Sequence, residues 1–236
     1  MKKIFYWTAI AVILLQVVTA CSKEEKFYTC DPETDAWVKN NLTEIQLMHR
    51  QDLQPFSDEQ QRGCFRAFTP EQRYKVWIDK LIHVGNLNLS RDKVQHIDVL
   101  IAKMKVNWYD EKAREDTTFS AEIDNFIQQW IADAYKLGWT RNEIGGIVAT
   151  LREVEIKDNT IVLKNSPDLD STEDGDKGII YDCECSLRSD WCWWSTCKNK
   201  ICDKTGWCGT LFLYECNGMC VQGVSDNVTV QPQPRN

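Results

Sequence analysis

The chain has 236 residues, of which 43% are hydrophobic and 27% are charged, and its formal net charge is −7. This composition is typical of one or two globular domains and excludes a multi-span membrane protein. The negative balance, with no basic stripe along the sequence, argues against a nucleic-acid partner because like charges repel phosphate backbones. The eleven cysteines are unevenly spaced, and their spacing divides the chain into two parts.

Residues 1–20 have the organisation of a lipoprotein signal peptide. Lys2 and Lys3 form a positive start, and the apolar run that follows is too short to be a comfortable membrane span. The run ends in Val-Thr-Ala before Cys21, which resembles a bacterial lipobox. We therefore expect a lipid on Cys21 that anchors the chain to a membrane, with residues 21–30 as a tether. An ordinary secretory peptide and an uncleaved anchor are the alternatives.

The residues after Cys21 bear on the final location of the protein. No aspartate follows the cysteine, so the sequence lacks a signal for retention in the inner membrane. Ser-Lys-Glu-Glu at positions 22–25 is similar to the surface-export signal of Bacteroidetes lipoproteins. The alternative is that these charges form a solvated tether. We expect an exported protein that is anchored to the bacterial outer membrane, with the cell surface as its position when the signal acts.

Residues 31–156 carry apolar residues at helical spacing and predict a domain of five or six helices around a common core. A first helix is expected from near Asp31 to about Arg50. Ser57 and Gln60 have the spacing of a capping box, which opens a second helix. Three tryptophans fall on the apolar faces, where core packing is favoured over a ligand pocket, and these are Trp37, Trp77 and Trp130.

The later helices are predicted from their start and stop signals. Four polar residues are expected to open helices, and these are Thr69, Ser90, Ser120 and Thr140. Gly85 and Gly138 are expected to end the first and third of these helices. The three histidines of the chain are widely separated and have no metal-binding spacing, so they predict no metal site.

Residues 157–182 are predicted to form an acidic linker that is open to proteases, with a short strand at 161–163. A partial match to a calcium-binding loop begins at Asp170. The pattern requires an acid at its twelfth position, where this chain has Tyr181, so no metal is predicted there.

Residues 183–220 are predicted to form a small disulfide-rich domain of β and irregular structure. A segment of this length buries too little apolar area to fold without covalent links. The spacing lacks the paired C-x-x-C units of zinc sites, so disulfides are favoured over metal. Eight cysteines are expected to form four bridges of undetermined connectivity, and these are Cys183, Cys185, Cys192, Cys197, Cys202, Cys208, Cys216 and Cys220. Residues 221–236 are expected to be a disordered tail.

Two cysteines remain once Cys21 is assigned to the lipid and eight to the C-terminal cluster. Cys30 and Cys64 are therefore expected to pair with each other in an oxidising, exported compartment. The predicted fold class is mainly α, with a helical N-terminal domain followed by a small disulfide-rich, β or irregular C-terminal domain.

Four tryptophans near the clustered cysteines are the candidate binding residues, and these are Trp191, Trp193, Trp194 and Trp207. Tryptophan among balanced charges suits a membrane interface or a protein contact. The alternative is that most of these rings wrap the disulfides as a small core. Trp193 and Trp194 are neighbours, so an extended chain cannot easily turn both inward.

The cysteine-rich segment carries a family resemblance. Cys-Glu-Cys-Ser at 183–186, followed by Ser-Asp-Trp-Cys at 189–192, resembles the opening of the fulvocin C-related bacteriocins. Gly-Trp-Cys-Gly at 206–209 and Cys-Asn-Gly at 216–218 are similar to the later part of that family. The helical region, including 69–80, also looks like the long N-terminal part of its larger members. The chain departs from the family in its lipid anchor and in Glu215, because the family pattern there is C-x-C.

The resemblance implies a bacteriocin-related exported lipoprotein whose cysteine-rich tail is an antibacterial module acting on the envelope of a target cell. The alternative is a surface-anchored immunity or protein-binding module without killing activity, and a third possibility is a surface-contact module. No nucleophile and base, and no open metal site, stand in a recognisable pattern. We therefore predict no enzyme and no cofactor, and we expect the membrane and a target envelope or partner protein as partners.

Overall fold

The computed structural model describes residues 26–164, 184–192, 196–199 and 206–221. This part of the chain is mainly helical with a disulfide-rich C-terminal region, which confirms the predicted fold class. The signal peptide, the lipobox with Cys21, the calcium-like sequence and nearly all of the predicted tail lie outside the described residues. Within the described ranges, no helix combines the length and the apolar character that a membrane span requires.

The first predicted helix is broken into shorter pieces. The structure has α2 (Pro32–Asn40), α3 (Leu42–Ile45) and the 3-10 turn η1 (Arg50–Leu53) in place of one helix that reaches Arg50. Asn41 lies between α2 and α3 with a non-helical φ of −114°. Its side-chain amide donates to the backbone carbonyl of Trp37 at 2.7 Å, and this bond competes with helix continuation.

Three capping boxes define the helices that the sequence predicted best. Ser57, Thr69 and Thr140 each accept a hydrogen bond from the backbone amide three residues later, whose side chain bonds back to the cap. These caps open α4 (Asp58–Ala67), α5 (Pro70–Gly85) and α9 (Arg141–Val148).

The middle of the chain departs from the prediction at one helix start and in two short helical elements that the sequence did not predict. It contains α6 (Arg91–Lys103), η2 (Val106–Tyr109), α7 (Glu111–Arg114) and α8 (Thr117–Lys136). Ser120 does not open α8, as the sequence suggested, but lies inside it. Asp116 is the cap, because its carboxylate accepts from the amides of Thr118 and Phe119. Gly138 follows the helix with a φ of +78°, as expected for a stop signal.

Two small antiparallel sheets complete the fold. β1 (Val154–Lys157) pairs with β2 (Thr160–Leu163), so the predicted short strand exists and the predicted linker begins inside a hairpin. The second sheet contains β3 (Glu184–Cys185), β4 (Thr196–Asn199) and β5 (Gly218–Val221), in the order β3-β5-β4. The apolar run 211–214 forms no regular strand, because Thr210–Phe212 is the 3-10 turn η3.

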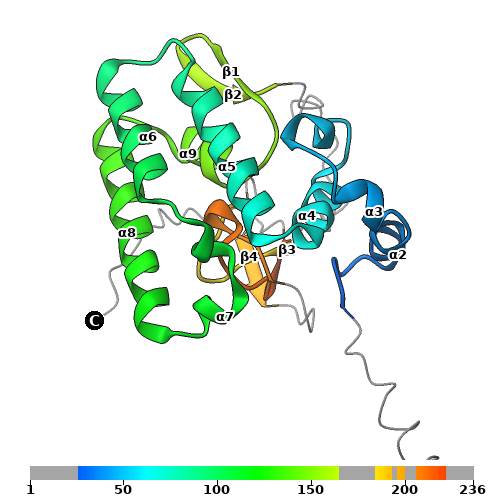
Figure 1. Cartoon of the computed structure of the whole chain (residues 1–236). Helices are drawn as coiled ribbons and strands as arrows, with labels where there is room; N and C mark the ends of the chain where they lie inside the picture. The colour runs from blue at the N-terminus through cyan, green and yellow to red at the C-terminus, as the bar shows by residue number, and fades with distance from the viewer. Residues whose placement is uncertain (1–25, 165–183, 193–195, 200–205, 222–236) are drawn as a thin grey trace, which may run out of the picture.

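One apolar core joins both parts of the chain. Trp77 and Trp130 are buried in it as predicted, while Trp37 is half-buried at its edge. The C-terminal residues of the same core are Trp207, Leu211, Phe212, Leu213 and Tyr214. Figure 1 shows the orange C-terminal segment lying among the helices. Below, residues 26–151 are called the helical body, and the described residues from 184 to 221 are called the stapled segment.

Candidate functional site

The site centres on a short loop of the stapled segment, residues 206–216, here called the strap. A disulfide joins Cys208 to Cys216 near its two ends. The backbones of Cys208 and Tyr214 also exchange two hydrogen bonds, of 2.7 and 3.0 Å, so the loop between them is closed twice. The strap is therefore a compact turn that presents its apolar side chains to the helices.

The backbone of the strap is strained. Trp207, Leu211 and Phe212 all have positive φ values, of 77°, 51° and 53°. Left-handed conformations are unfavourable for residues with a Cβ and persist only where the surroundings impose them. Gly209 has a φ of +70°, and a Cβ there would lie 2.6 Å from the Cβ of Ser189, so only glycine fits.

Aromatic rings of the helical body are one of the restraints that hold this conformation. The ring of Phe212 packs edge-to-face against Phe65 at 5.1 Å and against Trp77 at 5.2 Å between ring centroids. Trp207 packs against Phe65 and Tyr109, and the guanidinium of Arg73 lies 4.1 Å from its ring centroid. The strap thus completes the core of α4, α5 and η2.

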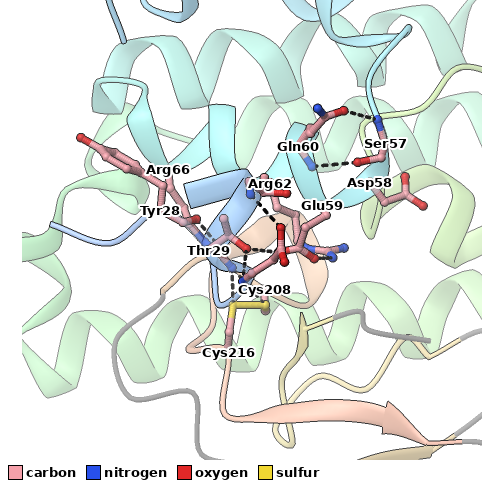
Figure 2. A network of polar contacts seen from close by, with 12 residues as sticks. Tyr28, Thr29, Ser57, Asp58, Glu59, Gln60, Arg62, Arg66, Cys208 and Cys216 are labelled. Atoms are coloured by element: carbon pink, nitrogen blue, oxygen red, sulfur yellow. Dashed lines mark hydrogen bonds and ion pairs between the residues drawn. A yellow bond between two sulfur atoms is a disulfide. The ribbon is translucent and has the colours of Figure 1, made fainter. Parts of the chain in front are cut away.

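Arg66 of α4 joins the strap to the start of the described chain (Figure 2). Its side chain is buried, and its guanidinium donates to the backbone carbonyls of Gly206 at 2.8 Å and Tyr28 at 2.6 Å. Its Nη2 atom also lies 2.9 Å from Sγ of Cys216 and 3.8 Å from Sγ of Cys208. A fixed positive charge therefore touches the strap disulfide.

Asp124 of α8 is a buried acid beside Tyr214 of the strap. Its carboxylate is nearly buried and lies 2.5 Å from the guanidinium of Arg188 and 3.9 Å from that of Arg114. Arg114 also donates to the backbone carbonyl of Leu213 at 3.2 Å. Burial lowers the pKa of Arg114 while Asp124 opposes that shift. Burial raises the pKa of Tyr214, which stays protonated beside this pair.

A pocket of about 900 Å³ follows the seam between the helical body and the stapled segment. Trp207, Leu213 and Tyr214 provide an apolar part of its lining. The charged part includes Lys26, Glu111, Arg114 and Arg188, so groups of both signs face the same space. A pocket of this size that mixes apolar rings with charges suits part of a protein chain or another amphipathic ligand.

The remaining described disulfides form a separate cluster in the small sheet. Cys185 pairs with Cys197, and Cys192 pairs with Cys220. The sulfur atoms of Cys185, Cys192 and Cys197 lie within 4.8 Å of one another. Because these sulfurs are joined in disulfides, they present no thiolate for a metal in this structure.

The expected bridge between Cys30 and Cys64 is absent. Cys64 is a free thiol with no exposed surface, and burial raises its pKa to about 12. Cys30 is disulfide-bonded to a partner outside the described residues. The counting argument assumed that Cys30 and Cys64 were left over for each other, whereas the structure leaves Cys64 unpaired. Cys183 and Cys202 also lie outside the described residues.

The four candidate tryptophans do not form one exposed surface. Trp207 is buried at 9% exposure, so in this fold it cannot serve as a free contact residue. Trp191 is half-buried, and its indole nitrogen donates to the hydroxyl of Thr210 at 2.8 Å. Trp193 and Trp194 lie outside the described residues.

Sequence reasoning did not select Arg66, Asp124 or Arg188. Asp124 offered the clearest signal, because it is an acid next to Ile123 in the apolar stripe of α8. The structure shows that Asp124 is buried, which is rare for an acid without a partner. Arg66 offered only a weak signal within the polar sequence of α4. The histidines that the sequence left without a role include His83 and His96, whose ring nitrogens lie at 3.1 and 2.9 Å from backbone carbonyls.

Comparison with known proteins adds no relative to this picture. No family model, no curated protein and no solved structure matches the chain.

Proposed function

We propose that this chain is an exported, lipid-anchored, bacteriocin-related surface protein that acts as a binding module of the immunity class and not as a diffusible toxin. The carrying observation is the burial of Phe212 and Trp207 of the strap in the core of the helical body. A toxin peptide released from the chain would have to leave these contacts. It would also expose apolar surface in both parts, which is unfavourable in water.

The seam pocket is the proposed binding surface. Its lining comes from both parts of the chain, so the pocket exists only while the stapled segment stays docked. Arg188 stands at this site with a side chain that is 69% exposed, and Leu187 beside it is an exposed apolar residue. Exposed arginine next to apolar surface is typical of protein-binding sites. The ligand we infer is a segment of a bacteriocin-like polypeptide.

The released-toxin function remains the second candidate, and the sequence resemblance at 183–192 favours it. The acidic residues between 168 and 182 would then be the region in which a protease separates the tail from the body. This candidate predicts that the tail occurs free in the culture medium, whereas the binding-module candidate predicts that it stays with the cell.

A survival experiment tests the proposal. The full chain is expressed in a bacterium that is sensitive to the spent medium of a bacteriocin-producing strain. The cells are exposed to that medium, and colony counts are compared with and without the chain. We expect protection by the native chain and its loss in Cys21→Ala, which removes the lipid site. Palmitate labelling of the native chain and of Cys21→Ala checks the anchor separately.

Two charge reversals test the pocket itself. Arg188→Glu changes the charged wall of the pocket, while Lys198→Glu makes the same charge change on an exposed position of β4 outside the pocket lining. We expect Arg188→Glu to lose protection and Lys198→Glu to keep it at equal surface levels. Equal protection by both variants would reject the pocket. Growth inhibition by the oxidised full chain, or by its released tail, would favour the toxin candidate.

A further inference from the structure

The strap disulfide differs from the other described disulfides in the charge that touches it. Nη2 of the buried Arg66 lies 2.9 Å from Sγ of Cys216 but 3.8 Å from Sγ of Cys208. A guanidinium at hydrogen-bond distance stabilises a thiolate far more than a neutral sulfur. If the bond is cleaved, the positive charge therefore favours Cys216 as the sulfur that carries the negative charge.

Opening the loop that this disulfide closes also relieves backbone strain. Leu211 and Phe212 both occupy left-handed backbone conformations inside the closed loop. Such conformations persist only while the surrounding structure holds them, and the disulfide is one of the restraints. Cleavage removes that restraint, so both the relaxation of the loop and the charge of Arg66 stabilise the reduced form.

We infer that Cys208–Cys216 is a redox-responsive site whose substrate is a dithiol reductant, with Cys216 as the leaving group. A thiolate of the reductant attacks Sγ of Cys208, the disulfide bond breaks, and its electron pair leaves on Sγ of Cys216 beside Arg66. The second thiol of the reductant loses its proton to solvent and attacks the mixed disulfide. Cys208 leaves as a thiolate and takes up a proton, and the reductant ends as a disulfide.

Reduction at this site changes the seam pocket. Leu213 and Tyr214 lie inside the loop that the disulfide closes, and both line the pocket. Arg114, a third lining residue, donates to the backbone carbonyl of Leu213. Cys208 and Cys216 are themselves buried, so the attack requires the strap to move and expose the disulfide. Redox state and pocket shape are therefore coupled through the strap, whatever the pocket binds.

The test measures the redox equilibrium of each disulfide in the full-length chain. The protein is equilibrated in buffers of graded reduced-to-oxidised dithiothreitol ratio, quenched with acid, alkylated and analysed by peptide mass spectrometry. We expect Cys208–Cys216 to be reduced at a lower ratio than Cys185–Cys197 and Cys192–Cys220. Arg66→Met should raise the ratio needed for Cys208–Cys216 at least tenfold, which corresponds to about 30 mV for this two-electron couple. Arg66→Lys, which keeps a positive charge, should restore most of the shift.

A matched arginine variant serves as the control, and a second measurement is available if Arg66→Met does not fold. Arg141→Met removes an arginine that donates to the backbone carbonyls of Asp190 and Cys192 and not to the sulfurs of the strap. It should leave the Cys208–Cys216 midpoint unchanged. If Arg66→Met fails to fold, the pH dependence of alkylation in the reduced native chain replaces it, and Cys216 should ionise at a lower pH than Cys208. Reduction of the strap disulfide last, or equal ionisation of the two thiols, would overturn the inference.

Discussion

The helical body and the stapled segment solve the same stability problem by different means. In the body, capped helices bury an apolar core, and Cys64 within that core is a free thiol. In the stapled segment, every described cysteine is in a disulfide, and the apolar residues of the strap are buried against the body. The helical body supplies most of the core, while the stapled segment supplies disulfides and the apolar side chains of the strap. The segment's disulfides alone therefore do not account for the fold of the strap.

The first prediction concerns the free thiol of the body. With its pKa raised from 9.0 to about 12, the Cys64 thiolate at pH 8 is about a thousandfold rarer than that of an ordinary thiol. We expect alkylation of Cys64 by iodoacetamide to be at least a thousandfold slower in the native chain than in urea, measured by peptide mass spectrometry. The stability that the neutral thiol contributes is complete below pH 9 and is lost as the pH rises through 12. A Cys30–Cys64 bridge in a non-reducing peptide map would refute this assignment.

The second prediction separates the contribution of strap packing from that of the disulfides. Phe212→Ala removes the ring that packs between Phe65 and Trp77 and leaves the disulfide in place. We expect the helical body to lose about 3–5 kcal/mol of unfolding free energy, measured by urea denaturation with circular dichroism at 222 nm. Leu187→Ala, at an exposed position of the same segment, should change it by less than about 0.5 kcal/mol. A similar small effect of Phe212→Ala would show that the body does not depend on the strap.

The third prediction sharpens the comparison at the backbone of the strap. Gly209→Ala places a Cβ 2.6 Å from Cβ of Ser189 at a φ of +70°. Left-handed strain and overpacking together should cost about 2–4 kcal/mol. Gly206→Ala is the matched control, because a Cβ there meets nothing within 4 Å. Thermal unfolding followed by circular dichroism compares the two variants, and equal melting temperatures would contradict the strained conformation of Gly209.

The smallest predicted effect concerns the seam away from the strap. Arg141 of α9 donates to the backbone carbonyls of Asp190 at 2.8 Å and Cys192 at 3.2 Å, and its side chain is 44% exposed. Because water competes for these bonds, Arg141→Ala should cost only about 1 kcal/mol. Hydrogen exchange of the amides at 189–192 should rise more than that of α5. Unchanged exchange at 189–192 would show that Arg141 does not hold the segment.

The sequence predicted those parts of the fold that depend on neighbours along the chain. Ser57, Thr69 and Thr140 were identified as caps because each bonds to the residue three positions later, and this pattern is readable as a sequence spacing. Ser120 was misassigned for a related reason. Asp116, a better cap with a charged acceptor, stands four residues earlier and satisfies the same helix end.

The candidate site was predicted only in part. The sequence indicated which C-terminal residues are chemically unusual, namely the clustered cysteines and the tryptophans between them. It did not indicate that Trp207 is buried, because its partners Phe65 and Tyr109 belong to distant helices. Nor did it indicate a free Cys64, because the choice among many cysteines depends on which sulfurs the fold brings together.

By itself, then, the sequence determined the helical class, most helix starts, the disulfide-rich character of the C-terminal part and the short strand after α9. These follow from local hydrogen bonding and from periodic apolar residues, which act over a few positions. Tertiary structure alone decided the docking of the strap, the seam pocket and the contact between Arg66 and Cys216. Those two residues are 150 positions apart, and only the burial of Phe212 and Trp207 in a shared core brings them within hydrogen-bond distance.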